Sequence, residues 1–456
     1  MPKMNHPFRK ILPLIIALAA CFSASAFEPL LNIPYEESTT IGLYIKDLRT
    51  GEVLVDHKSR RAMTPASVTK LFTSAAILMQ RGTSFQFQTD VCLSGCADPA
   101  DPARWQGDII INSVADPTID HPEFASFGGF CDSIIAKLQA RGITSISGSI
   151  RINESLEDAG PIANWECEDI PWAYGAGLYG FNYARNVVEV FPNKGITVPA
   201  SSLKIRVVQS RGTTDLRRGF NSDNLTVVIP RRKRQQRELS FTTTVNNPAD
   251  MFTRLLTERL LAAEITLENG SATCEPITLL YPHTSTYLGE IVYVTNKNSD
   301  NLLAEGLLRA LEPDSCRQAC IDTEIQLLDS LHVPTESLDI LDGSGLSRAT
   351  LMSPYTAAVL LENMLQTNYA DLFVDMLPVA GVDGTLKSFA VDTPLQNRLV
   401  MKTGSMRSVQ NMAGYILDDE GWPSHVVVVF VNGFRCKRAD LRTAIADYLA
   451  QFIDNE

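Results

Sequence analysis

The sequence lacks several features that mark common classes of protein. No apolar run in its 456 residues reaches the roughly 20 residues that span a bilayer, and no repeat or low-complexity tract is present. A net charge of −12 argues against nucleic acid as a partner. The 6 histidines are scattered without a His-Glu-x-x-His motif, so we expect neither a metal nor another cofactor. The Gly-x-Ser-x-Gly elbow of many Ser-His-Asp hydrolases is also missing, which makes lysine the better candidate base.

The first 26 residues have the pattern of a secretory signal peptide. Basic residues precede an apolar run over residues 11–20, and Ala24-Ser25-Ala26 forms a small-residue cleavage site. We therefore expect an exported, periplasmic protein without a transmembrane segment. Lipoprotein processing at Cys21, which would leave a lipid anchor, is the less favoured alternative. Removal of the leader takes away three cations and no acid, so the charge falls from −12 to −15.

The cysteine content suits an oxidising compartment. Nine cysteines become eight when Cys21 is removed, and an even number favours disulfides while leaving their pairing open. Cys92 and Cys96 bracket a Leu-Ser-Gly turn and are the preferred local pair. Cys316 and Cys320 lie one helical turn apart, where a bridge requires a compliant backbone. Buried free thiols are the alternative for both pairs.

Patterns near the two ends of the chain predict one sheet covered by helices. Residues 41–55 alternate apolar and polar around a Thr-Gly turn, which predicts a β-hairpin, and residues 67–80 have apolar residues at helical spacing. Near the other end, residues 426–433 form the continuous apolar run of a strand buried on both faces. The apolar residues from 441 to 452 recur at helical spacing again.

The middle of the chain has a different character, with short β-like segments broken by glycine, asparagine and proline. A chain of this length exceeds what a single hydrophobic core organises. We predict a discontinuous domain of residues 27–88 and 283–456, with a mainly β insertion at residues 89–282. The basic run from Arg231 to Arg237 within the insertion is interpreted as a solvated turn, with a polyanion site as the alternative.

Ser67 and Lys70 are the candidate nucleophile and base. Their i and i+3 spacing on a predicted helix places hydroxyl and amine on one face, within hydrogen-bond reach. A serine hydroxyl needs a base to take its proton, and lysine serves when burial or nearby positive charge lowers its pKa. Backbone N–H groups at the helix start favour a developing oxyanion. An N-capping serine is the alternative interpretation.

Two later motifs complete a known set. Ser299-Asp300-Asn301 precedes a helical stretch, and Lys402-Thr403-Gly404 precedes an extended segment. Ser-x-x-Lys, Ser-Asp-Asn and Lys-Thr-Gly in this order characterise serine β-lactamases and penicillin-binding proteins. In the strand-like duplicate Ser201–Lys204, the serine and the lysine would point to opposite faces, so we reject it. We also reject the duplicate Ser222–Asn224, because a strand-like run follows it where the site needs a loop backed by a helix.

With these motifs, the sequence resembles the class C low-molecular-mass penicillin-binding proteins, the serine-type D-Ala-D-Ala carboxypeptidase/endopeptidase family. Matching stretches include TPASVTKLFTSAA, YGAGLYGFN, NSDNLLAEGLL, DGSGLSR and KTGSMRSVQNMAGYI. The resemblance implies an α/β (α+β) transpeptidase fold similar to serine β-lactamases, in which helices cover an antiparallel sheet, with a large insertion. It also implies a hydrolase that acts on peptidoglycan stem peptides and is acylated by β-lactam antibiotics.

The resemblance assigns catalytic roles to four of these residues. Ser67 attacks the carbonyl of the penultimate D-Ala to form an acyl-enzyme, and Lys70 acts as the base. Ser299 relays a proton to the leaving group, with Lys402 helping to hold the pKa of Ser299.

Substrate binding falls to the other matching positions. Asn301 would bind the peptide amide, and Thr403 with Gly404 and Lys402 would hold the terminal carboxylate. Ser405, often threonine in the family, keeps a hydroxyl and would share the oxyanion hole with the backbone of Ser67. Asp169 matches an acidic position that could bind an amine of the stem peptide, with a plain surface carboxylate as the alternative.

Four glycines, Gly343, Gly345, Gly381 and Gly384, are expected in turns near the cleft. A serine β-lactamase is one alternative function, although no Glu-x-x-Leu-Asn follows Asn301 before Lys402. A non-catalytic peptidoglycan-binding protein is another, against which the intact motifs argue.

Overall fold

The computed structural model describes residues 30–231, 239–268 and 276–453. The predicted leader with Cys21, and the basic run apart from Arg231, lie outside these residues. None of the helices in the described ranges has the length and apolar character needed to cross a membrane.

One half of the molecule is built on a five-stranded antiparallel sheet with the order β17-β18-β19-β1-β2. Its strands are β1 (Thr40–Asp47), β2 (Val53–His57), β17 (Leu399–Met406), β18 (Val409–Leu417) and β19 (Pro423–Asn432). The hairpin predicted over residues 41–55 is confirmed as β1 and β2, and the apolar run at 426–433 as β19. Strands from the two ends of the chain therefore pair side by side.

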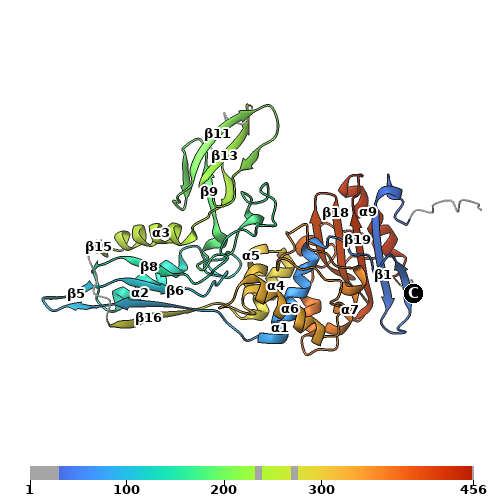
Figure 1. Ribbon diagram of the computed structural model, residues 1–456, viewed down its shortest axis with the longest axis horizontal. Coiled ribbons are helices and arrows are strands. Elements are labelled where there is room, and N and C mark those ends of the chain that lie inside the picture. Colours follow the sequence, from blue (N-terminus) through green and yellow to red (C-terminus); the bar gives the residue numbers. More distant parts are fainter. Residues whose placement is uncertain (1–29, 232–238, 269–275, 454–456) are drawn as a thin grey trace, which may run out of the picture.

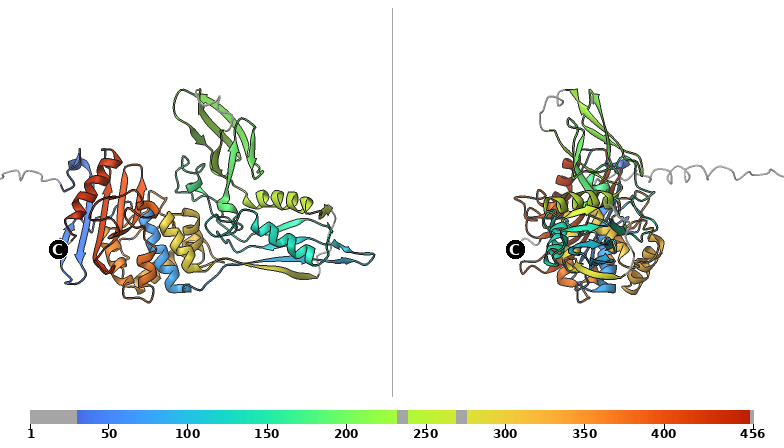
Figure 2. Two further views of the ribbon diagram at one scale, coloured as in Figure 1. Left: turned by 180° about the vertical axis from the view of Figure 1, so that it is seen from behind. Right: turned by 90° about the vertical axis from the view of Figure 1, so that its left-hand side faces the viewer.

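Helices cover both faces of this sheet (Figure 1, Figure 2). Alternate residues of β19 belong to two separate hydrophobic cores, with Val428 in one and Val429 in the other. The C-terminal helix α9 packs on the second core, as its predicted spacing requires, and the other helices pack on the first. The helices are α1 (Thr69–Arg81), α4 (Leu288–Asn298), α5 (Asn301–Arg309), α6 (Arg317–Ser330), α7 (Pro354–Met364), α8 (Ala370–Asp375) and α9 (Arg438–Ala450).

The chain leaves this half through β3 (Gln88–Ser94) and returns through β16 (Ile277–Thr284), which pair antiparallel with Gln88 opposite Thr284. The segment between them extends away from the five-stranded sheet (Figure 1). Together with β3 and β16, this segment forms two four-stranded sheets, ordered β16-β3-β6-β8 and β15-β7-β5-β4. It also forms two three-stranded sheets, ordered β10-β9-β14 and β11-β13-β12. A third hydrophobic core lies among these elements.

The remaining strands are β4 (Cys96–Asp98), β5 (Asp101–Gln106), β6 (Ile109–Asn112), β7 (Ser145–Ser147), β8 (Ile150–Asn153), β9 (Val187–Phe191), β10 (Ile196–Val198), β11 (Lys204–Ser210), β12 (Asp215–Arg217), β13 (Asn224–Pro230), β14 (Phe241–Thr244) and β15 (Thr266–Glu268). Two helices, α2 (Gly129–Ala140) and α3 (Pro248–Ala262), accompany them. In α3 the Asn247 side chain accepts from the Asp250 N–H, and Pro248 occupies the first helical position.

The preferred local disulfide is wrong. Cys92 is buried in β3 whereas Cys96 is exposed in β4, and both thiols are free. The pair Cys316 and Cys320 is free as well, since Cys316 is exposed before α6 while the Cys320 thiol turns inward, 3.5 Å from the carbonyl oxygen of Cys316. In each pair, one side chain points into the protein and the other to solvent, so sequence proximity does not bring the sulfur atoms together.

Candidate active site

The loop before α1 places Ser67 at the edge of the five-stranded sheet. Residues Ala66–Val68 form a 3-10 turn that leads into α1, and Ala66 has a φ of 51°, a left-handed conformation that is uncommon for alanine. The adjacent strand β17 approaches closely at Gly404, where a Cβ atom would lie 2.4 Å from the Pro65 carbonyl oxygen. Only glycine allows this contact, which holds the Lys-Thr-Gly segment beside Ser67.

Lys70 faces Ser67 from the first turn of α1 and is completely buried. Its Nζ lies 3.0 Å from Ser67 Oγ, 2.6 Å from Asn301 Oδ1 and 2.7 Å from the Ser344 carbonyl oxygen. A neutral amine has two hydrogens and one lone pair. When the two oxygens of Asn301 and Ser344 accept those hydrogens, the lone pair is directed at the Ser67 hydroxyl. The geometry therefore suits lysine as a general base.

Burial lowers the pKa of Lys70 to about 8, against the opposing effect of Asp342, Glu305 and Asp300, which raise it. Desolvation disfavours the charged ammonium, so a substantial fraction of the amine is neutral near physiological pH. This is the protonation state that a base for Ser67 requires.

Ser299 and Lys402 form a second hydroxyl–amine pair. Ser299 ends α4 with a left-handed φ of 58°, and its Oγ accepts a hydrogen bond of 2.8 Å from Lys402 Nζ on β17. Burial, and then the charge of Lys70, hold the pKa of Lys402 well below its usual range. Two buried lysines thus meet at one site, each bonded to a serine hydroxyl.

Asn301 is held on both sides. Besides accepting from Lys70, its side chain donates through Nδ2 to the Tyr174 carbonyl oxygen at 2.7 Å. The preceding residue, Asp300, caps α5 through the Leu303 N–H, and its carboxylate contacts Arg185 at 2.7 Å. Burial tends to raise the pKa of Asp300, but His121 and Arg185 outweigh it and keep the pKa well below the usual range.

A cavity of about 430 Å³ opens over these groups. Ser67, Ser299, Asn301 and Ser405 line it, together with Asp169. Its other lining residues are Glu168, Tyr174, Gly345, Leu346, Arg348, Met406 and Arg407. Lys70 and Lys402 lie behind this surface and reach it through their serine partners.

The remaining predicted positions lie around the cavity. Thr403 is buried, and its hydroxyl donates to Thr385 Oγ1 at 2.7 Å. Ser405 is exposed and bonds to Gln410 Oε1 at 3.2 Å. Asp169 accepts a hydrogen bond of 2.9 Å from the Tyr174 hydroxyl, and burial raises the pKa of this carboxyl despite that bond.

The turn Asp342–Gly345 joins this site to the long segment between β3 and β16, called the extended segment below. Trp165 donates from Nε1 to Asp342 Oδ2 at 2.8 Å, and Asp342 also accepts from the N–H groups of Gly345 and Ser347. Sequence reasoning missed Trp165, as it missed the contacts of Asp300, because no motif marks partners so distant in the chain. Of the four glycines expected near the cleft, Gly345 lines the cavity itself and has a φ of 72°.

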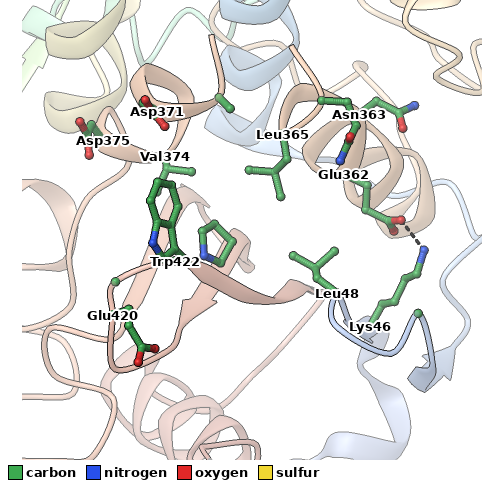
Figure 3. A pocket seen from close by; sticks show the side chains of 15 residues that line it. Lys46, Leu48, Glu362, Asn363, Leu365, Asp371, Val374, Asp375, Glu420 and Trp422 are labelled. Carbon is green, nitrogen blue, oxygen red and sulfur yellow. Dashed lines mark hydrogen bonds and ion pairs between the residues drawn. The ribbon is translucent and has the colours of Figure 1, made fainter. Parts of the chain in front are cut away.

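A larger cavity lies elsewhere among the described residues. It measures about 760 Å³ and is lined by residues such as Lys46, Leu48, Glu362 and Trp422, with none of the motif residues among them (Figure 3). Trp422 is 63% exposed at its edge, and Lys46 pairs with Glu362 at 2.5 Å. Cavity size alone does not find the chemical site in this molecule.

The architecture defines the class of the protein. It matches the crystal structure of penicillin binding protein 4 from Haemophilus influenzae with a TM-score of 0.77 at 22% identity, covering 92% of this chain and 97% of that one. The same protein complexed with a β-lactam matches with a TM-score of 0.72. The α+β fold expected from the sequence, with helices over an antiparallel sheet, is thereby confirmed.

Sequence comparison gives the family. The family model described as D-Ala-D-Ala carboxypeptidase 3 (S13) matches residues 26–455, so the chain belongs to this family. It is 26% identical to a D-alanyl-D-alanine carboxypeptidase of Actinomadura sp., over 94% of this chain and 84% of that protein. It is 24% identical to carboxypeptidase DacB of Haemophilus influenzae, over 92% and 90%. The protein is a serine-type hydrolase and a low-molecular-mass penicillin-binding protein.

Proposed function

We propose that this protein cleaves D-alanyl-D-alanine-type bonds in peptidoglycan stem peptides through an acyl-enzyme at Ser67. The observation that carries the proposal is the convergence of Ser67, Lys70 and Asn301 with the Lys402–Ser299 pair around one cavity. In the first step Lys70 takes the hydroxyl proton while Ser67 Oγ attacks the carbonyl of the penultimate D-Ala. Collapse of the tetrahedral intermediate breaks the peptide bond and leaves the acyl group on Ser67.

Ser299 completes the proton transfer in this proposal. Its hydroxyl lines the cavity and gives its proton to the departing amine, while Lys402 stabilises the oxygen and returns a proton to it. Backbone N–H groups of Ser67 and Ser405 stabilise the oxyanion. Water then hydrolyses the ester and regenerates the free hydroxyl of Ser67.

Substrate recognition is assigned to the rest of the cavity. Asn301 binds the peptide amide with the hydrogen and lone pair that its protein contacts leave free, and Lys402 and Thr403 attract the terminal carboxylate. Asp169 accepts an amine of the stem peptide. β-Lactams, whose amide carbonyl takes the place of the scissile one, acylate Ser67 in the same way.

We further propose that residues 27–88 and 283–456 form the catalytic domain and that residues 89–282 form an inserted domain. The separate hydrophobic cores of the two parts support this division. Export to the periplasm through the leader at 1–26 would deliver the enzyme to its substrate.

The test compares two substrates with the purified protein and a Ser67→Ala variant. The proposal predicts release of D-alanine from a pentapeptide ending in D-Ala-D-Ala, cleavage of a cross-linked muropeptide dimer, or both, by the wild type alone. Cleavage of only one substrate decides between carboxypeptidase and endopeptidase. Failure on both substrates, or retention of activity by the variant, would overturn it. Rapid turnover of penicillin without peptide cleavage would favour a β-lactamase instead.

A further inference from the structure

Three buried carboxyl groups contact the turn Asp342–Gly345 or Thr73 of α1, close to Lys70 in the chain. Glu305 on α5 is 2% exposed, and Glu324 on α6 and Asp342 are 0% exposed. None of the three lines the cavity over Ser67. Burial of a charged carboxylate is costly unless hydrogen bonds or cations compensate it, so the protonation state of each group follows from its contacts.

Asp342 is fully supplied with donors. Its two oxygens accept from the N–H groups of Gly345 at 2.8 Å, Ser347 at 2.7 Å and the Trp165 indole at 2.8 Å. Three N–H donors stabilise the ionised form, because a carboxylate accepts them all without offering a proton. The charge of Asp342 acts on Lys70, Glu305 and Glu324.

Glu324 has the opposite surroundings. Its Oε1 lies 3.1 Å from Thr73 Oγ1, which also lies 3.0 Å from the Gly343 carbonyl oxygen. A hydroxyl has a single hydrogen, so Thr73 satisfies both contacts only if it donates to Gly343 and accepts from a protonated Glu324. Burial raises the pKa of Glu324 to about 8, and the negative charges of Glu305 and Asp342 add to the effect. Glu324 therefore holds its proton below about pH 8.

Glu305 lies between these extremes and is connected to Lys70 through one residue. Its Oε1 accepts from the Ser344 N–H at 2.9 Å, and the carbonyl oxygen of Ser344 accepts from Lys70 at 2.7 Å. Its Oε2 has no hydrogen-bond partner among the described residues. Burial and then Asp342 raise the pKa of Glu305 to about 7, while Arg317 and the N–H groups oppose them.

The charges that face these groups come from several elements. The charge of Asp342 raises the pKa of Glu305 and that of Arg317 lowers it, while Glu305 in turn raises the pKa of Glu324. Lys70 interacts with Asp342, Glu305 and Asp300, and with Lys402 on β17. Asp300 and Asp342 accept hydrogen bonds from several donors. Glu305 has one oxygen without a partner among the described residues, so its contacts stabilise the charged form the least of the three.

We propose that Glu305 is a positioning residue whose negative charge helps retain the proton on Lys70 and whose hydrogen bond fixes the Ser344 carbonyl against that amine. Glu324 is protonated below about pH 8 and is not among the acids whose charge acts on Lys70. The proposal rests on the assignment of Lys70 as the base for Ser67. It makes the pH at which the enzyme becomes active depend on an acid that does not touch the substrate.

The test is the pH profile of kcat/KM for D-alanine release in Glu305→Gln and Glu324→Gln variants. Activity of the wild type rises with pH as Lys70 loses its proton. Removal of the Glu305 charge destabilises the ammonium, so the acid limb of Glu305→Gln is expected to move about one unit toward lower pH. Glu324 is not among the acids whose charge acts on Lys70, so Glu324→Gln is expected to leave the limb in place. Glu305→Asp, which keeps the charge, should move it less than Glu305→Gln.

An unchanged acid limb in Glu305→Gln, or an equal shift in Glu324→Gln, would overturn the proposal. If Glu305→Gln does not fold, Glu305→Asp and Glu324→Gln still decide. The shorter acid withdraws from the Ser344 N–H, so a wild-type limb in Glu305→Asp, or a shifted limb in Glu324→Gln, contradicts the proposal. The rate of penicillin adduct formation, followed by mass at each pH, checks that the limb belongs to acylation. Adduct formation on a Ser67→Ala variant would instead refute the proposed function itself.

Discussion

Lys70 Nζ and Asn301 Oδ1 lie 2.6 Å apart although 231 residues separate them in the chain. The contact joins α1 to α5, and Asn301 in turn donates to the Tyr174 carbonyl oxygen from the long segment between those helices. One amide group therefore links the candidate base to both halves of the molecule. Its orientation directs the Lys70 amine toward Ser67.

Replacement of Ser299 by alanine tests the proton relay. Ser299→Ala removes the hydroxyl that joins Lys402 to the cavity, so we expect kcat/KM for D-alanine release to fall by about 10²- to 10⁴-fold. The matched control is Ser222→Ala, in the second Ser-Asp-Asn tripeptide, whose Oγ accepts a local hydrogen bond from the Asn224 N–H. Similar rates for the two variants would contradict the relay.

A glycine in the turn that holds Lys70 provides a steric test. Gly345 has a φ of 72°, and a Cβ atom there would lie 2.1 Å from the Ala66 carbonyl oxygen. Gly345→Ala should therefore displace the turn and lower both the melting temperature and the acylation rate. Gly51→Ala is the control, because φ is 76° but no atom lies within 4 Å, leaving only a backbone cost of about 1–2 kcal/mol. Equal losses in the two variants would show that the contact with Ala66 is unimportant.

Substitution of Trp165 tests whether the segment between β3 and β16 supports catalysis. Trp165→Phe keeps an aromatic ring beside Leu346 but removes the N–H donated to Asp342. Loss of a hydrogen bond to a buried carboxylate costs about 1.5–3 kcal/mol, so we expect penicillin acylation to slow by roughly 10-fold or more if the turn loosens accordingly. Trp422→Phe, at an exposed position in the distant cavity, should acylate at the wild-type rate. Acylation of Trp165→Phe at the wild-type rate would show that this hydrogen bond from the segment between β3 and β16 does not support catalysis.

Glu324 gives a stability prediction with a defined sign. Its pKa is raised from 4.5 to about 8 in the folded protein, so the native state retains a proton that the unfolded chain releases above pH 4.5. The wild type should lose stability relative to Glu324→Gln as pH rises from about 4.5 to 8, and the difference should then level off. The full effect is on the order of 4 kcal/mol. Chemical denaturation at several pH values measures it, and a pH-independent difference would refute the assigned protonation.

The sequence predicted the elements whose signals are local. Apolar runs and alternation located β1, β2, β19 and α9, and three short motifs located the serines and lysines that meet at the cavity. The duplicates are separated from the site as expected: Ser201 precedes β11 and Ser222 precedes β13. Motif order and local structure together selected the copies that meet at one cavity.

Features that depend on distant contacts were not predictable. The partners of Asp300 and Asp342, namely Arg185 and Trp165, come from a segment whose packing no motif records. Glu305 gave a weak signal, a lone acid among the leucines of α5, whereas Glu324 looked like part of an ordinary polar face. The local disulfide failed because a four-residue separation says nothing about which side chain is buried.

The most direct measurement is the intact mass of the protein after incubation with penicillin, for the wild type, Ser67→Ala and Ser201→Ala. Ser201 begins the duplicate Ser-x-x-Lys and bonds to Thr197 in the extended segment, so its variant controls for mutation itself. The account predicts one penicillin adduct on the wild type and on Ser201→Ala, and none on folded Ser67→Ala. An adduct on Ser67→Ala, or its absence from the folded wild type, would contradict the assignment of Ser67 as the nucleophile.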